Sequence, residues 1–410
     1  MRVMTGVVRL VLGLAVVFAL VSTLASSPSV SAEAVEALVR GNNAFAFDLY
    51  SVVSSREGNL FVSPYSISSA LAMTYAGARG NTAVQMADVL NHDLAPDRLH
   101  QSFSELNKAF NAGGESYRLS VANALWSQVG LRFLPEYISV AERYYDAGLR
   151  EVDFVFHTEE ARSIINRWVE DKTEGKIVDL IGPGVLDPLT RLVLTNAIYF
   201  KGQWEQPFRP EQTEEAPFYL SAGKQATVPF MHQIGTFKYA ETSNAQALEL
   251  PYSGNELAMT VLLPEPDASL AELEAAIQAD GIQSILEALS PTKVDVSIPR
   301  FKFEAELSLS EYLQQLGMTD AFDDNIADFS GISDTFLYIT HVLHKAFIEV
   351  NEEGTEAAAA TAVVVGTKSI RLELPEIFVA DRPFIFLIRD LRTGSILFLG
   401  RMADPLSKQE

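Results

Sequence analysis

The chain has 410 residues, 48% of them hydrophobic, and a formal net charge of −22 at pH 7. This content can form a large buried core, and the negative charge excludes nucleic acids and anionic membrane surfaces as partners, since both bind basic patches. The sequence contains no cysteine, which excludes disulfides, thiol nucleophiles and thiolate metal ligands.

The first 32 residues differ in composition from the rest. Arg2 and Arg9 give the N-terminal end a positive charge and precede an apolar run at residues 10–25. The small residues Val30-Ser31-Ala32 follow and offer a cleavage site. This order predicts a signal peptide over residues 1–32 and a secreted, extracellular protein; the alternative is a membrane anchor, for which 16 apolar residues are few. Removing the segment changes the charge from −22 to 29 − 53, or −24.

The remaining residues, 33–410, contain no linker-like boundary and predict a single domain. Apolar residues at helical spacing predict helices over 33–51, 66–76, 98–112, 158–174, 269–289 and 309–316. In the helix over 158–174, Ile164, Ile165 and Trp168 are expected to face inward.

Apolar runs and alternating patterns predict the strands of the domain. These cover residues 119–128, 191–200, 257–263, 294–303, 370–374 and 383–389. The helices and strands are mixed without a regular βαβ repeat, so an α+β domain with several sheets is predicted.

A search for catalytic motifs finds no nucleophile elbow, phosphate-binding loop, zinc-protease motif or dinucleotide fingerprint. His341 and His344 are three residues apart, but their surroundings predict a strand, in which the two side chains point to opposite faces. Core histidines are therefore favoured over a metal site. The adjacent acids Glu352 and Glu353 indicate a solvated turn, and we expect no enzymatic activity, cofactor or metal.

Residues 352–371 have conflicting local preferences. The segment begins with two acids and Gly354, continues through alanines that favour helix, and ends in valines that favour strand, followed by two basic residues. Such a stretch can be a buried strand, a linker, or a segment that changes state.

Several long stretches resemble the serpin family of serine protease inhibitors, over residues 34–405. The matching stretches are NLFVSPYSISSALAMTYAGARGNT at 59–82, INRWVEDKTEGKI at 165–177, LTNAIYFKGQWEQPF at 194–208, LGMTDAF at 316–322, HKAFIEVNEEGTEAAAAT at 344–361, and VADRPFIFLIRDLRTGSILFLGRM at 379–402. The resemblance implies a serpin fold with three β-sheets, eight or nine helices and an exposed reactive loop.

The resemblance also implies a function for residues 352–371, as the hinge and reactive loop of a suicide-substrate inhibitor. A target protease would cut the loop and form an acyl-enzyme, and the freed loop would insert as a strand of the main sheet before deacylation. The alternative is a non-inhibitory serpin that acts as a carrier, chaperone or storage protein, in which charges or prolines tend to interrupt the hinge.

The resemblance identifies the hinge as ten consecutive residues: Glu352, Glu353, Gly354, Thr355, Glu356, Ala357, Ala358, Ala359, Ala360 and Thr361. Every second residue of an inserting strand must enter the sheet interior, so these positions should be small or apolar. By the family's register they are Thr355, Ala357, Ala359, Thr361, Val363, Val365 and Thr367, and none is charged.

The scissile bond depends on which end of the loop is used for counting. The family's spacing from the hinge places it between Lys368 and Ser369, which implies a trypsin-like serine protease as covalent partner. Counting back from Pro383 places it after Leu372, four residues later, with a chymotrypsin-like target. Arg371 is the second choice, since it is also basic.

Five further positions correspond to structural positions of the family. Ser63, Ser66, Asn196 and His344 match a hydrogen-bonded cluster under the main sheet, where strands must part, and Trp204 matches a position where insertion begins. We expect a monomer.

The helix over residues 98–112 bears on activation by polysaccharides. Members of the family that such activators stimulate carry a basic helix, whereas this one offers only Arg98 and Lys108 as cations. No heparin-type activator is therefore expected.

Overall fold

The computed structural model describes residues 31–111, 117–145, 148–220, 223–355 and 374–407. Within them it contains nine α-helices: α1 (Ala32–Val53), α2 (Pro64–Tyr75), α3 (Gly80–Val89), α4 (Pro96–Asn111), α5 (Pro135–Tyr145), α6 (Thr158–Lys172), α7 (Leu270–Asp280), α8 (Gln283–Ala288) and α9 (Ser310–Gln315). No helix in these ranges is both long and apolar enough to cross a membrane.

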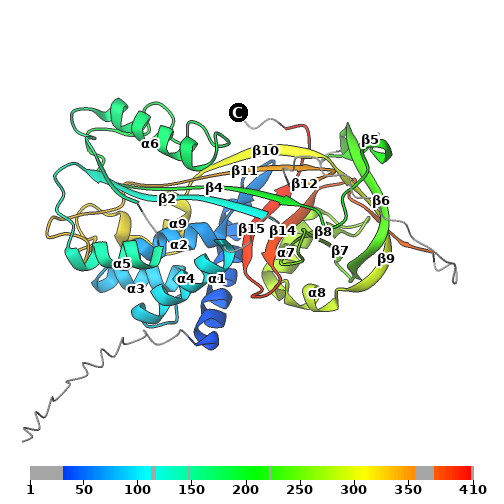
Figure 1. Cartoon of the computed structure of the whole chain (residues 1–410), viewed down its shortest axis with the longest axis horizontal. Coiled ribbons are helices and arrows are strands. Elements are labelled where there is room, and N and C mark those ends of the chain that lie inside the picture. Colours follow the sequence, from blue (N-terminus) through cyan, green and yellow to red (C-terminus); the bar gives the residue numbers. More distant parts are fainter. Residues whose placement is uncertain (1–30, 112–116, 146–147, 221–222, 356–373, 408–410) are drawn as a thin grey trace, which may run out of the picture.

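One sheet has six strands in the order β10-β11-β12-β4-β2-β3. Their bounds are β10 (Phe301–Ser308), β11 (His341–Asn351), β12 (Gly354–Thr355), β4 (Leu192–Gln203), β2 (Tyr117–Gln128) and β3 (Gly148–Val152). Figure 1 shows this sheet crossing the molecule, with α6 on one face and α2, α4 and α5 on the other.

The second sheet has nine strands, in the order β1-β15-β14-β8-β7-β6-β9-β13, with β5 paired to β6. Their bounds are β1 (Leu60–Val62), β15 (Ile396–Met402), β14 (Phe384–Asp390), β8 (Leu257–Pro264), β7 (Ala245–Pro251), β6 (Gln225–Glu241), β9 (Ser290–Pro299), β13 (Glu376–Val379) and β5 (Glu214–Tyr219). The resemblance implied three sheets, whereas the described residues form two, because the long strand β6 pairs with β5, β7 and β9 and so keeps all nine strands in one sheet. The predicted α+β fold with several sheets is confirmed.

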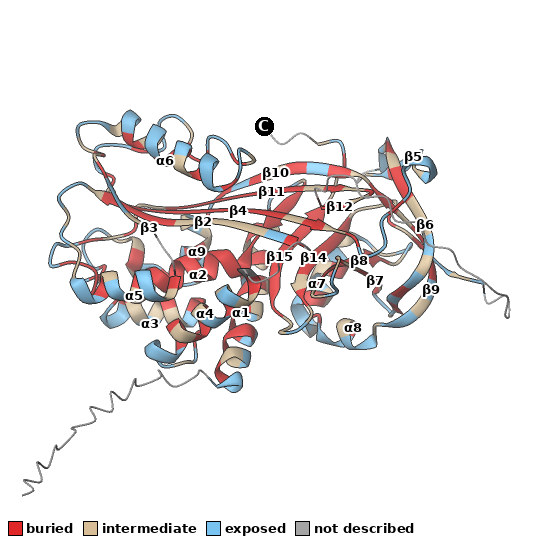
Figure 2. Ribbon diagram, viewed as in Figure 1, coloured by how far each residue is buried: buried red, intermediate tan, exposed pale blue. Residues whose placement is uncertain are grey.

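Helix α2 lies at the centre of the molecule, and its sequence explains how it begins. The side chain of Ser63 accepts a hydrogen bond from the backbone N–H of Ser66, and Pro64 occupies the first turn, where its missing N–H costs nothing. All residues from Pro64 to Thr74 are buried, as Figure 2 shows for this helix and the neighbouring sheet. This position fixes Ser63 and Ser66 directly beneath the six-stranded sheet.

Two predicted elements are each divided in the structure. The strand predicted over residues 294–303 is interrupted at Arg300, because β9 pairs with β6 in one sheet while β10 pairs with β11 in the other. The helix predicted over residues 269–289 is interrupted at Gly281, whose φ of 73° ends α7.

One inward position in α6 was wrongly predicted. Ile164 is 41% exposed, whereas Ala161, Ile165 and Val169 form the buried face at four-residue spacing. An apolar residue beside the helix's inward stripe was mistaken for part of it.

Two predictions fall largely or wholly outside the described residues. Of the strand predicted at 370–374, only Leu374 is among the described residues, and Leu374 is not in a strand. Of the predicted signal peptide, only Ser31 and Ala32 are among the described residues. Ser31 caps the start of α1 by accepting a hydrogen bond from the backbone N–H of Ala34.

Candidate functional site in the six-stranded sheet

Strands β4 and β11 are in contact along most of their length but separate at one end. They pair in parallel from His341↔Val193 to Phe347↔Tyr199. Beyond this point β12 lies between them, pairing with both strands in antiparallel orientation. The two residues of β12 therefore occupy the position that a longer strand, continuing from Thr355, would have to enter.

Gly354 can approach β4 only because it has no side chain. Its φ is 152°, and a Cβ added there would lie 2.0 Å from the carbonyl oxygen of Gly202. Since that contact is with backbone, no rotamer change could relieve it. Glycine is thus required for β12 to begin between the two strands.

Aromatic side chains hold Thr355 in the sheet. The hydroxyl groups of Thr355 and Tyr252 are 2.7 Å apart, and both residues are fully buried. The ring of Tyr252 stacks on Trp204, with centroids 4.7 Å apart and an interplanar angle of 12°. Trp204 Nε1 also donates a hydrogen bond to the carbonyl oxygen of Asn351 at 3.0 Å. We call Trp204, Tyr252 and Thr355 the hinge cluster.

Glu352 anchors the chain immediately before β12. It is 5% exposed, and its carboxylate accepts hydrogen bonds from Arg300, through Nε at 2.6 Å, and from the hydroxyl of Thr213. Burial alone would raise the pKa of Glu352, but the hydrogen bonds from Arg300 and Thr213 outweigh it and lower the pKa. The prediction of a solvated turn is therefore wrong for Glu352, because Arg300, between β9 and β10, supplies a buried partner.

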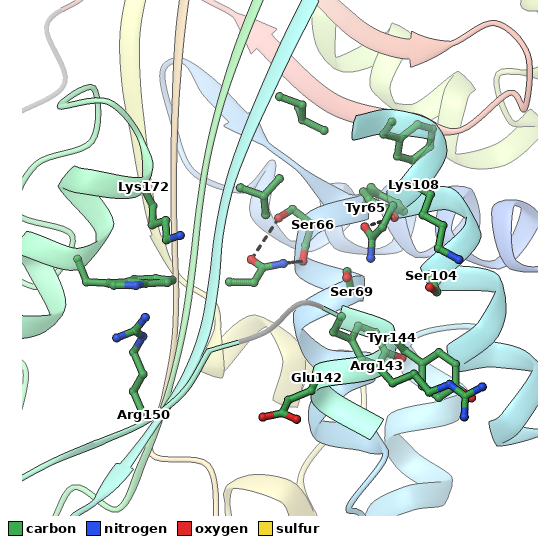
Figure 3. A pocket seen from close by; sticks show the side chains of 17 residues that line it. Tyr65, Ser66, Ser69, Ser104, Lys108, Glu142, Arg143, Tyr144, Arg150 and Lys172 are labelled. Carbon is green, nitrogen blue, oxygen red and sulfur yellow. Dashed lines mark hydrogen bonds between the residues drawn. The ribbon is translucent and has the colours of Figure 1, made fainter. Parts of the chain in front are cut away.

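A second group of polar residues lies beneath the middle of the sheet. Asn196 Nδ2 donates to Ser66 Oγ at 2.6 Å, and Ser66 Oγ donates to Asn123 Oδ1 at 3.3 Å. Ser63 Oγ donates to the carbonyl oxygen of Leu397 in β15 at 2.7 Å. We call Ser63, Ser66, Asn123, Asn196 and His344 the central cluster. Figure 3 shows Ser66 with its hydrogen bond to Asn123.

The hydrogen bonds of His344 define its protonation state. The backbone N–H of Ser63 donates to His344 Nε2 at 3.3 Å, so this nitrogen carries no proton. His344 Nδ1 lies 2.5 Å from Asn196 Oδ1 and donates its proton there. Burial lowers the pKa of His344 to about 3, which keeps the ring neutral at pH 7.

The central cluster connects the two strands that would have to part. Asn196 belongs to β4, His344 to β11 and Asn123 to β2, whereas the two serines lie at the start of α2. Moving β4 away from β11 would break the bond between Asn196 and His344 and leave two buried polar groups without partners.

Five residues singled out from the sequence fall into two places in the structure. Ser63, Ser66, Asn196 and His344 meet in the central cluster, and Trp204 lies in the hinge cluster.

The sequence interpretation missed Asn123, Tyr252 and Arg300. Of these, only Asn123 gave a usable signal, as an amide within an otherwise largely apolar predicted strand. The predicted bond-cleavage residues, Lys368 to Leu372, and the hinge residues from Glu356 to Thr361 lie outside the described residues.

The hinge cluster gives a first prediction. Replacing Tyr252 with Phe removes the partner of the Thr355 hydroxyl, and a buried hydroxyl without a partner costs about 1–3 kcal/mol. We expect Tyr252→Phe to lower the thermal midpoint of the uncleaved protein. Tyr219→Phe is the matched control, because Tyr219 is 51% exposed and should show no change. Equal midpoints for the two variants would contradict the role assigned to Tyr252.

Glu352 gives a second prediction, on pH dependence. Because its pKa is lower in the folded protein than in the unfolded chain, its contribution to stability is present above the unfolded value of about 4.3 and is lost as pH falls below it. Glu352→Gln should therefore lower the thermal midpoint at pH 7 and have a progressively smaller effect at acid pH. Glu353→Gln, one residue away, is the control. A difference between Glu352→Gln and the native chain that is constant with pH would contradict this account.

Comparison with known proteins agrees with this geometry. Residues 40–405 match the family model described as serpin (serine protease inhibitor). The human leukocyte elastase inhibitor is 43% identical over 382 residues, covering 90% of this chain and 100% of the relative. Serpin B6 of Pongo abelii is 42% identical over 377 residues, with the same coverage.

Solved structures show the same fold. Serpin48 of the insect Tenebrio molitor has a TM-score of 0.81 and 34% identity, covering 90% of this chain and 98% of that one. Human thyroxine-binding globulin, solved in complex with thyroxine, has a TM-score of 0.83 and 31% identity, covering 91% and 100%.

The prediction of a secreted, extracellular protein is wrong. The curated relatives, leukocyte elastase inhibitor and serpin B6, are intracellular serpins and point away from secretion. The prediction depended on residues 1–32 alone, whereas the family match begins at residue 40 and reflects the folded domain.

The family model covers residues 40–405, which include both polar clusters and the strands that they connect, and the relatives and solved structures each cover about nine-tenths of the chain. The chain belongs to the serpin family of serine protease inhibitors.

Proposed function

We propose that this serpin is a suicide-substrate inhibitor of a trypsin-like serine protease. The protease cuts between Lys368 and Ser369 and forms an acyl-enzyme with Lys368. The loop on the N-terminal side of the cut then extends β12 between β4 and β11. The attached protease is carried along the sheet, and its catalytic site is distorted before water can release it.

The position of β12 is the observation that carries this proposal. Thr355 is the last described residue before the loop, and it already pairs with Gly202 of β4 and Val350 of β11. Continuing the strand from Thr355 leads directly toward the region where β4 and β11 pair with each other. Insertion would exchange the contacts between these two strands for two new rows of backbone hydrogen bonds.

The composition of the loop supports the same reaction. Thr355 is fully buried, and the alternate residues that follow it, to Thr367, are small or apolar. They can enter the interior between the sheet and the helices below without burying a charge. The hinge also contains no proline, which would remove a backbone hydrogen-bond donor from the new strand.

The choice of a trypsin-like target depends on Lys368. A lysine before the cut bond fits an acidic specificity pocket, and the spacing from the hinge selects this residue. Arg371, also basic, is the second choice for the residue before the cut, and the third is Leu372, which would imply a chymotrypsin-like target. A target that cuts after an apolar residue such as Leu372 is supported by the name of the human relative, which is an elastase inhibitor and is 43% identical to this chain.

Fold likeness does not separate an inhibitor from a binding protein. Thyroxine-binding globulin has as high a TM-score as the other neighbours, and it was solved with a hormone ligand. What favours inhibition here is a hinge without proline and without a charge at any inward-facing position from Thr355 onward.

Incubation with trypsin tests the proposal directly. We expect a covalent complex that survives denaturing electrophoresis, together with a released C-terminal peptide that begins at Ser369 in mass spectrometry. Lys368→Gln should abolish the complex with trypsin, whereas the control Arg371→Gln should preserve it. Cleavage without a stable complex would contradict inhibition, and a peptide beginning elsewhere would contradict the assigned bond.

The alternation of inward and outward residues gives a further prediction. Ala359→Glu would place a charge in the sheet interior on insertion, so insertion should slow and the acyl-enzyme should hydrolyse first. We expect the fraction of protein that is cleaved without trapping to rise at least about tenfold, which corresponds to about 1.4 kcal/mol. Ala358→Glu is the control, because residue 358 would face outward from the inserted strand. Equal effects of the two substitutions would contradict the assigned register.

A further inference from the structure

A continuous row of aromatic rings joins three helices on one side of the six-stranded sheet. The ring centroids lie between 5.6 and 6.1 Å apart, in the order Tyr75, His92, Phe103, Tyr145, His100 and Tyr144. We call these six residues the aromatic row. The rings come from the end of α2, from the connection between α3 and α4, from α4 itself and from the end of α5 (Figure 1). The aromatic row therefore links α4 to both α2 and α5.

The two histidines of the aromatic row are enclosed by uncharged groups. His92 is 8% exposed and His100 is 4% exposed. Both ring nitrogens of His92 are buried and have no hydrogen-bond partner in the described part of the chain. His100 Nδ1 lies 2.6 Å from the hydroxyl of Tyr145, and burial keeps this hydroxyl uncharged by raising its pKa. A positive charge on either ring would thus be placed among groups that cannot balance it.

The acidic side chains on the surrounding elements lie at the surface. Asp97, in the first turn of α4, raises the pKa of His100, but less than burial lowers it. The other acids, on α1, on α3, in the connection after α3, on α4 and on α5, are likewise exposed: Asp48, Asp88, Asp93, Glu105, Glu136 and Glu142. Helix α2 contains no charged residue. Because water and salt screen surface carboxylates, these acids offset little of the cost of charging a buried ring.

Positive charges on the aromatic row would also repel one another. His92 and His100 are close enough that charge on His100 lowers the pKa of His92. On α5, the guanidinium of Arg143 lies 5.3 Å from the ring centroid of Tyr144, and Arg98 on α4 is exposed. Burial is the largest cause of both shifts, and it lowers the pKa of His92 to about 3 and that of His100 to about 4.

We propose that the aromatic row is an acid-sensitive switch, which holds α4 against α2 and α5 near neutral pH and releases α4 when His92 and His100 take up protons. A protonated imidazole must reach water, and it can do so here only if α4 moves away from the rings that enclose it. The switch lies away from the reactive loop, so its test does not depend on protease inhibition.

The direction of the pH dependence follows from the two states of α4. In the released state the histidines take up protons at their ordinary pKa of about 6.5, whereas in the packed state they stay neutral down to about pH 4. The packed state is therefore fully favoured above about pH 6.5 and becomes less favoured as the pH falls below this value. Each histidine shifts the equilibrium toward release by up to about tenfold per pH unit.

Hydrogen exchange of the backbone amides of α4 tests the switch in the full, uncleaved chain. After correction for the intrinsic pH dependence of exchange, we expect the protection of α4 to fall at least about tenfold between pH 7 and pH 5. In His92→Phe/His100→Phe the aromatic packing remains but no proton is taken up, so α4 should keep its protection. Helix α6, on the opposite face of the sheet, is the internal reference and should not respond. An equal fall in the native chain and the double variant, or in α4 and α6, would overturn the proposal.

A matched pair of substitutions controls for the loss of two histidines. His157→Phe/His232→Phe removes histidines that are paired with Asp153 and Asp295, so α4 should respond to pH as it does in the native chain. The thermal midpoint at pH 7 shows whether each variant is folded. His92→Phe alone removes no described hydrogen bond, and it should reduce the fall in α4 protection by about half on a logarithmic scale. A full response of α4 in His92→Phe, or its loss in the control, would contradict the assignment.

Discussion

The parallel pairing of β4 with β11 is the contact on which the rest of the structure depends. It closes the six-stranded sheet over seven residue pairs, and it stops where the two residues of β12 enter. Backbone hydrogen bonds between two strands are individually modest, and they can be replaced by equivalent bonds to a third strand. A sheet closed in this way would lose little if a new strand took over the same hydrogen bonds.

The two polar clusters determine how easily this pairing opens. Under the middle of the sheet, His344 and Asn196 link β11 directly to β4, and breaking their bond exposes buried groups with no other partner. At the end where the strands separate, Glu352 and Thr355 are held by Arg300 and Tyr252. The start of the loop is thus fixed in the sheet, while the closed region beyond it resists premature insertion.

Buried polar networks are a costly way to hold a core together, since apolar residues of the same size often stabilise it as well or better. Their advantage here is that hydrogen bonds break and re-form with changed geometry, whereas an interlocked apolar core does not slide without strain. His344 is neutral and is held by one donor and one acceptor, so separating β4 from β11 would expose no buried charge.

The sequence predicted the major helices and strands, and the family resemblance singled out four of the five residues that meet in the central cluster, missing Asn123. Long apolar runs such as the one that forms β4 are unambiguous, and the match to the family identified Ser63, Ser66, Asn196 and His344. Arg300 was placed within one continuous strand because local periodicity does not show that β9 and β10 belong to different sheets. Its pairing with Glu352 across 52 residues is likewise a tertiary contact that no local pattern encodes. The N-terminal segment misled the prediction of location because its composition is independent of the domain that follows.

The central claim is that the loop enters the sheet between β4 and β11 after it is cut. The most direct measurement compares the thermal midpoint of the uncleaved protein with that of protein whose loop has been nicked by a protease that it does not trap. Insertion adds a full strand to the sheet, so the midpoint should rise by about 10 °C or more, corresponding to several kcal/mol. An unchanged midpoint would show that the cut loop stays outside the sheet, and would contradict the account.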